Sequence, residues 1–93
     1  MTADQVLNRA ELHQEAAHRA REALSVLRAD DVPERHPISA ACWEELGYAL
    51  RGLKRMPESA SALEKAAEIY GRLGTAYTAS AEHVRTVLGT PVR

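Results

Sequence analysis

Apolar and small side chains recur every three or four residues along most of the chain, with charged residues between them. This spacing places an apolar stripe along one side of a helix, and it predicts four helices separated by short breaks. We expect the helices over about residues 3–29, 38–55, 57–73 and 76–88. Two prolines in RADDVPERHP (residues 28–37), together with Pro57 and Gly74, mark the breaks.

The last two ranges leave two interpretations open. The helical spacing continues from Ala60 to Val87, which would suit one long helix over about residues 58–88. Gly71 and Gly74 oppose it, because each glycine costs about 1 kcal/mol relative to alanine inside a helix. We therefore favour a break or kink near Gly74, and the single long helix stays the alternative.

Composition points to the same fold class. The 93 residues include no Phe, one Trp and three Tyr, and alanine, the strongest helix former, is abundant. The sequence predicts a single all-α domain over residues 1–93, built from antiparallel helical hairpins as a small bundle of three to four helices. A chain of this length buries only about 60–65 % of the surface that it exposes when unfolded. We therefore expect pairing, most simply as a homodimer.

The hairpin over residues 40–74 resembles a tetratricopeptide repeat. That family pairs two antiparallel helices with the pattern W-x2-L-G-x2-[small or Tyr], followed by a small residue, a bulky residue and alanine on the second helix. The matching residues here are Trp43, Leu46, Gly47, Leu50, Ser59, Leu63 and Ala66. Leu50 stands where tyrosine is usual, and Gly71 stands where a proline closes the repeat. The flanks echo the pattern loosely.

The resemblance implies a protein–protein interaction module, an adaptor or regulator that receives a peptide or a partner helix. Gly47 would let the two helices cross closely. We expect the packing and binding groove to be lined by Trp43, Leu46, Gly47, Leu50, Leu63, Ala66 and Tyr70. Because such repeats usually need about three copies, we also expect self-association, and a seam on the first helix suits it: Val6, Ala10, His13, Ala17 and Leu24.

Charge narrows the choice of partner. The formal net charge is −1, which argues against a nucleic-acid ligand, since phosphate binding needs a basic surplus. Residues 1–47 carry 5 basic and 9 acidic side chains, whereas residues 48–93 carry 7 and 4. Halves of opposite charge favour the pairing of two copies. With no apolar signal region and no apolar run of about 20 residues, we expect a cytoplasmic protein that contacts no membrane.

The candidate chemistry is sparse, and we expect no enzyme and no cofactor. Glu15 and His18 form a Glu-x-x-His pair, which di-iron bundles use in duplicate, but no second pair exists here. The plainer interpretation pairs Glu15 with Arg19 and His18 with Glu22, each one helical turn apart. Cys42 is the only cysteine, which excludes an internal disulfide.

Two alternative functions stay open. One is a secreted helical hairpin similar to the small type VII secretion substrates. Those carry a Trp-x-Gly turn and a C-terminal Tyr-x-x-x-acid signal, whereas Trp43 is followed by two glutamates, and neither Tyr70 nor Tyr77 has an acid four residues on. The other is a metal-binding bundle that assembles by oligomerisation around Glu15 and His18.

Overall fold

The computed structural model describes the backbone of residues 3–89 and the side chains of residues 9–89. This part of the chain is helical and contains no strand. The elements are α1 (Ala3–Ala29), α2 (Pro37–Gly52), α3 (Met56–Arg72), the short 3₁₀ turn η1 (Thr75–Tyr77) and α4 (Thr78–Leu88). The predicted all-α class, a small helical bundle, is confirmed.

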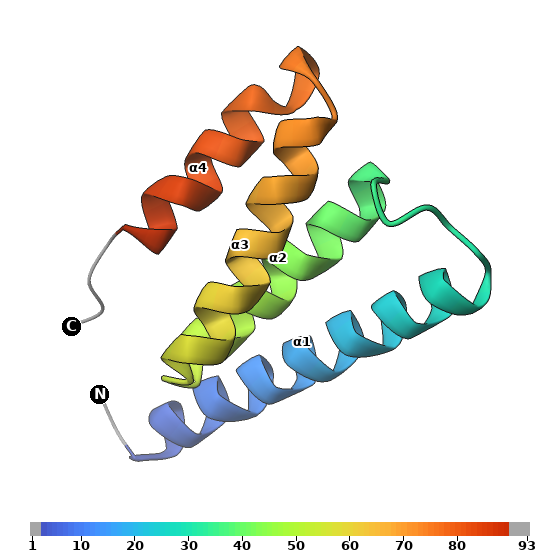
Figure 1. Cartoon of the computed structure of the whole chain (residues 1–93). Coiled ribbons are helices and arrows are strands. Elements are labelled where there is room, and N and C mark those ends of the chain that lie inside the picture. The colour runs from blue at the N-terminus through green and yellow to red at the C-terminus, as the bar shows by residue number, and fades with distance from the viewer. Residues whose placement is uncertain (1–2, 90–93) are drawn as a thin grey trace.

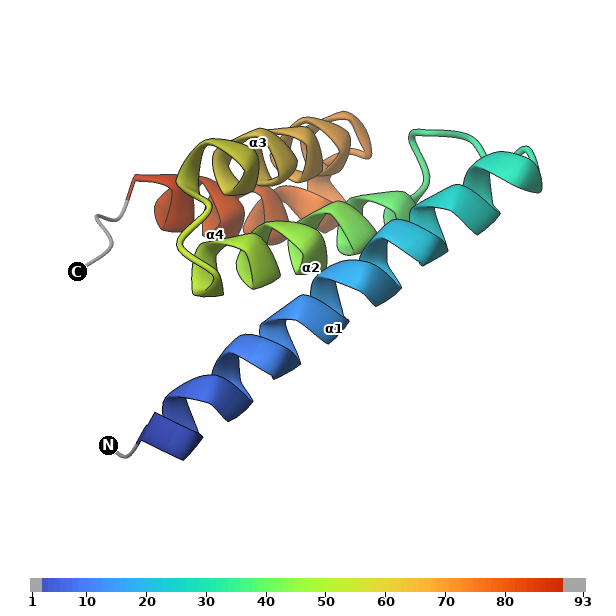
Figure 2. The same ribbon diagram turned by 90° about the horizontal axis from the view of Figure 1, so that it is seen from below.

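Each helix packs mainly on its neighbours in sequence. α2 lies in the middle, with α1 along one side and α3 along the other, and α4 packs on α3 (Figure 1). Successive helices run in opposite directions, so the chain is a series of antiparallel hairpins. Figure 2 shows that α1 crosses α2 obliquely and that its N-terminal turns diverge from α2. Much of the surface of α1 is therefore left uncovered.

The break between α3 and α4 decides between the two interpretations of residues 57–88. Gly74 has a φ of 97°, in the left-handed region that glycine adopts without steric cost. The chain then makes the η1 turn, and α4 begins at Thr78. Two helices follow each other here, as the two glycines predicted.

α2 ends earlier than the predicted residue 55. Lys54 has a φ of 63°, and its amide N–H donates to the carbonyl of Arg51 at 3.0 Å. The next amide, that of Arg55, donates to the carbonyl of Leu50 at 2.9 Å. This pair of bonds is the Schellman motif that closes helix C-termini. Lys54 and Arg55 therefore lie in the connection to α3. Asp31 (φ 56°) occupies the corresponding position after α1.

Two hydrophobic clusters form the core, and α2 and α3 contribute to both. The cluster that faces α1 contains Ala17, Ala20, Leu46, Ala49, Leu50 and Ala62. The cluster that faces α4 contains Ala40, Leu63, Ala66, Ala67, Ile69, Tyr70, Ala81 and Val84. Because alanine fills about half of these positions, the helix backbones can approach closely.

Helices α2 and α3 cross closely at Gly47, as the sequence predicted. A Cβ atom built on Gly47 would lie 2.5 Å from the side chain of Leu63 on α3. In addition, the Ser59 hydroxyl donates a hydrogen bond of 2.7 Å to the Gly47 carbonyl. The absence of a side chain at this position thus lets α3 rest directly on α2.

Candidate functional site

The seven residues predicted to line the groove lie where α2 meets α3 and its other neighbours. Leu46 and Leu50 belong to the cluster that faces α1. Leu63 and Ala66 are 2 % and 0 % exposed and lie in the cluster that faces α4. Of the seven, Trp43 alone is half-buried. These side chains therefore hold the helices together and offer little open surface.

The seam predicted for self-association faces α2 of the same chain. Ala17 is buried in the cluster that faces α1, and the half-buried Leu24 packs against that cluster. The His13 ring lies close to the end of α2. The side chain of Val6 lies outside the described residues. A second copy would consequently have to contact a different side of α1.

Another side of α1 exposes large apolar side chains together with α2. Leu12, Val26 and Ile38 are 61 %, 58 % and 48 % exposed, the highest values among the described large hydrophobic residues. Leu12 and Val26 are two heptads apart, so they lie on the same side of α1 as Ala16. Ile38 lies in the first turn of α2. We define the α1–α2 face as Leu12, Ala16, Val26, Ile38, Ala41 and Tyr48.

An open groove of about 510 Å³ runs along the middle of this face. It is lined by His13, Ala16, Arg19, Glu45, Tyr48 and Ala49. Arg19 comes from α1 and Glu45 from α2, and both side chains are exposed. Within the described part of the chain, neither of them belongs to an ion pair. The groove therefore carries one positive and one negative side chain, and the exposed side of α1 between Leu12 and Val26 also carries Glu15 and Glu22.

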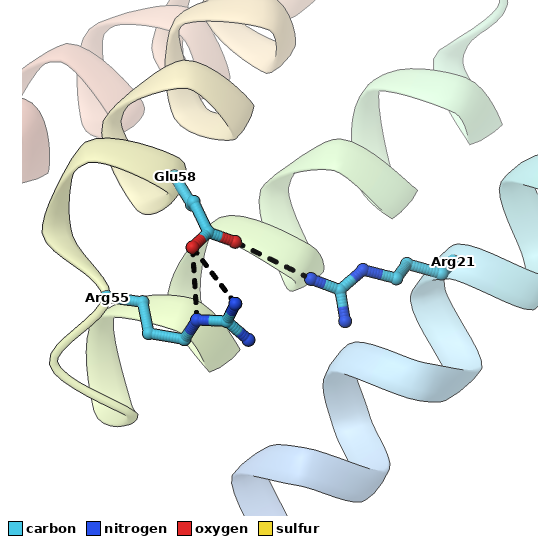
Figure 3. Close-up of polar contacts among 3 residues, drawn as sticks. All are labelled: Arg21, Arg55 and Glu58. Atoms are coloured by element: carbon cyan, nitrogen blue, oxygen red, sulfur yellow. Dashed lines mark hydrogen bonds and ion pairs between the residues drawn. The ribbon is translucent and has the colours of Figure 1, made fainter.

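A second groove, of about 560 Å³, lies between α1 and α3, with α2 beneath it. Its lining residues are Arg21, Glu34, Trp43, Leu46, Leu50, Glu58, Ser61, Ala62 and Lys65. Figure 3 shows that Glu58 lies between two arginines. Its carboxylate is 3.0 Å from Arg55 Nη2 and 3.9 Å from Arg21 Nη2, so it links α3 to α1. These side chains are about half exposed, so the pairs add little stability.

A further ion pair lies on the border of this second groove. Glu34, in the connection between α1 and α2, is 2.6 Å from Lys65 Nζ on α3. The hydrogen bond and the positive charge of Lys65 lower the pKa of the Glu34 carboxyl below its usual value. Because Glu34 is exposed, the pair orients the connection more than it stabilises the fold.

A cluster of tyrosines surrounds Glu44 where α2, α3 and α4 meet. Its carboxylate accepts hydrogen bonds from the hydroxyls of Tyr48 (2.8 Å) and Tyr70 (2.9 Å). The rings of Tyr70 and Tyr77 stack at 5.9 Å, and those of Tyr48 and His83 meet edge-on at 6.4 Å. Burial, followed by the bond to Glu44, raises the pKa of Tyr48 to about 12. The same causes raise the pKa of Tyr70. This network ties three helices together.

The residues considered for metal binding lie on the exposed side of α1. His18 Nε2 is 3.1 Å from Glu22 Oε1, which confirms the predicted pairing of these two side chains. Within the described residues, no group of three or more His, Cys, Asp or Glu side chains is placed to hold a metal ion. Cys42 is buried, and burial raises the pKa of its thiol, which lowers the reactivity of the sulfur.

Comparison with known proteins adds no relative. No protein-family model, no curated protein and no solved structure matches this chain. The resemblance to a tetratricopeptide repeat therefore rests on the pattern of residues 40–74 alone. Among the described helices, none is long and apolar enough to cross a bilayer.

Proposed function

We propose that this protein is a non-catalytic protein–protein interaction module, an adaptor or regulator that docks through the α1–α2 face. The observation that carries the proposal is the exposure of Leu12, Val26 and Ile38, three large apolar side chains on two adjacent helices. Large apolar side chains that gather on a surface mark interaction sites, whereas isolated ones are ordinary.

The free energy gained when a partner covers apolar surface favours the α1–α2 face over the second groove. Covering apolar surface contributes about 25 cal/mol per Å², so exposed side chains have the most to gain from a partner. Leu46 and Leu50 on the floor of the second groove are 6 % and 2 % exposed, and they gain almost nothing. Leu12 and Val26 are mostly uncovered in the isolated chain.

The architecture also favours an interaction module. Antiparallel hairpins that pack in series present extended surfaces built from adjacent helices, and this is the use that tetratricopeptide-like repeats make of them. Trp43 lies within α2 and not in a turn between two long helices. The alternative of a type VII secretion hairpin therefore gains no support from this position.

The proposal is tested by photo-crosslinking in the cells that make the protein. A photoreactive amino acid replaces Val26 in one variant and Leu12 in another. Met56, a 37 % exposed residue at the start of α3, outside the α1–α2 face, receives the same replacement as a control. We expect discrete adducts of defined mass from positions 12 and 26 and none from position 56.

Two results of the crosslinking experiment would contradict the proposal. Circular dichroism of each variant serves as the folding control. In a variant that is folded, the absence of an adduct is not due to misfolding. Loss of adducts at both face positions in folded protein would overturn the proposal. Equal crosslinking from position 56 would also contradict it, because the α1–α2 face would then have no special role.

A further inference from the structure

We propose that two copies of this chain form a dimer by exchanging α4, with Gly74 as the hinge. In this exchanged dimer, α3 and α4 of each copy join into one continuous helix, and α4 packs on α2 and α3 of the partner. The inference goes beyond the proposed function, because it concerns the site that α4 occupies and names a second copy of the chain as its other occupant.

The contacts of α4 in the single chain are ones that a second copy can reproduce. Ala81 and Val84 are 1 % and 0 % exposed in the cluster between α3 and α4. Towards α2, the Arg51 guanidinium donates to the carbonyl of Val87 at 3.4 Å. These contacts do not depend on the covalent connection between the two helices. An α4 helix supplied by another chain can therefore make them equally well.

The apolar spacing of α3 continues into α4 without a change of register. The side chains that follow it alternate by three and four residues, and they are Leu63, Ala66, Tyr70, Leu73, Tyr77, Ser80, Val84 and Val87. In a continuous helix these eight residues lie along one side, which is the pattern of helices that pair over a long contact. The sequence therefore suits a continuous helix as well as the observed hairpin.

This stripe of residues is self-complementary about the hinge. α3 and α4 are antiparallel (Figure 1), and the stacking of Tyr70 on Tyr77 places the centre of the hairpin between residues 73 and 74. Leu63 and Val84 are equally far along the chain from this centre, and both lie in the same cluster.

Two continuous helices that pack antiparallel at this centre bring the same residue types together between chains. Tyr70 then meets Tyr77 of the partner subunit, and Leu63 meets the partner's Val84. A twofold axis through the centre thus repeats, twice, the contacts that α3 and α4 make within one chain. Exchange of an identical element is a low-cost route to a dimer for this reason.

Gly74 holds the balance between the hairpin and the continuous helix. Its φ of 97° and ψ of −169° form a combination that is essentially restricted to glycine. A Cβ atom on Gly74 would meet nothing within 4 Å, so only the backbone conformation opposes another residue here. The connection is also short, since α3 ends at Arg72 and η1 begins at Thr75, and short hinges invite exchange.

Gly74→Ala tests the hinge by sedimentation equilibrium. Alanine is strained in the turn and favoured in a helix, so we expect the dimer dissociation constant to fall about tenfold for each of the two hinges, or about a hundredfold in all. Gly89→Ala is the matched control. Gly89 has an ordinary φ of −82°, and its Cβ would make only ordinary contacts at 3.7 Å, so dimerisation should not change.

A d-alanine at position 74 separates the backbone strain from the added methyl group. Its mirror-image preference suits a φ of 97° and opposes the continuous right-handed helix, so this chain should dimerise no more than the wild type. Cys42 is the only cysteine, and two synthetic segments can be ligated at this residue. Equal dimerisation of the l-alanine and d-alanine variants would overturn the proposal.

A crosslink between unlike chains shows which chain α4 packs on. The rings of Tyr48 on α2 and His83 on α4 meet at 6.4 Å. One Gly74→Ala chain carries Tyr48→Cys and another carries His83→Cys, with Cys42→Ala in both. A short bis-maleimide should join the two chains in a mixture and should join neither chain to itself, because positions 48 and 83 meet across chains only when α4 is exchanged.

Three results would contradict the exchange. One is a folded Gly74→Ala chain that stays monomeric at high concentration. Another is a dimer that gives no crosslink between the two cysteine variants, because each α4 would then lie on its own chain. The third is a loss of helix content in Gly74→Ala by circular dichroism, because a continuous helix contains no strained residue and should keep that content.

Discussion

At the scale of single residues, small side chains set the distance between the helices. Gly47 lies against Leu63, and Ala40 and Ala66 are fully buried at the contacts of α2 and α3. The role of Gly47 could be predicted, since a glycine flanked by bulky residues on a helix indicates a close crossing. The exposure of Ile38 could not be predicted, because the sequence around an isolated apolar residue near a helix start does not show whether another element covers it.

Gly47→Ala should lower the free energy of unfolding by about 1–3 kcal/mol, because the new Cβ would overlap the Leu63 side chain. Gly71→Ala is the matched control. Its Cβ would meet only the mobile end of Arg85, at 3.3 Å, so alanine should stabilise α3 by up to about 1 kcal/mol. Urea denaturation of the two variants measures both changes, and a neutral Gly47→Ala would contradict the close crossing.

The hydroxyl of Tyr48 makes the stability depend on alkaline pH. Its pKa is raised from the ordinary value near 10 to about 12, so the folded state favours the neutral phenol. This contribution is complete below pH 10 and is lost as the pH rises towards 12. Tyr48→Phe should therefore reduce the loss of stability above pH 10. Urea midpoints measured at pH 8 and pH 11 test this, and equal losses in both proteins would count against it.

At the scale of helices, the sequence indicates where elements begin more reliably than where they end. Prolines 37 and 57 predicted the starts of α2 and α3, since proline fits the first turn of a helix. The end of α2 was predicted wrongly, because the chain turns at Lys54 and not at a glycine. Lysine gives no signal for a left-handed conformation, and only the hydrogen bonds of the turn reveal it.

Lys54→Gly should stabilise the protein by a few tenths to about 1 kcal/mol. Glycine removes the steric cost of the left-handed conformation at this position, and the gain is partly offset by the greater freedom of the unfolded chain. Lys54→Ala is the control, since it removes the same charge and keeps the steric cost. Thermal melts of both variants give the difference, and identical melting temperatures would contradict the explanation.

At the scale of the whole molecule, the order of the helices could be predicted from their apolar patterns. Which side of each helix packs within the chain could not. The first helix carries two apolar sides, and periodicity alone does not say which one packs within the chain. The structure assigns Ala17 to the inner contact and leaves Leu12 and Val26 outside. The sequence thus predicted the class of fold, while the α1–α2 face became visible only when α1 and α2 were placed side by side.

Hydrogen exchange should follow the position of each helix in the series. α2 and α3 contribute to both hydrophobic clusters, so their amides should exchange most slowly. The N-terminal turns of α1 diverge from α2, and these should exchange fastest among the helical segments. Mass spectrometry of peptic fragments measures this order. Slowest exchange in α1 or α4 would be inconsistent with a core centred on α2 and α3.

The packing of each helix on its sequence neighbours also bears on how quickly the chain finds its fold. Contacts between residues close in sequence close only short loops, so little chain entropy is lost before they form. Helical proteins of this kind fold in microseconds to milliseconds. The hairpin of α2 and α3, joined by a short connection and held at Gly47, is the natural place for folding to start, with α1 and α4 adding to its two sides.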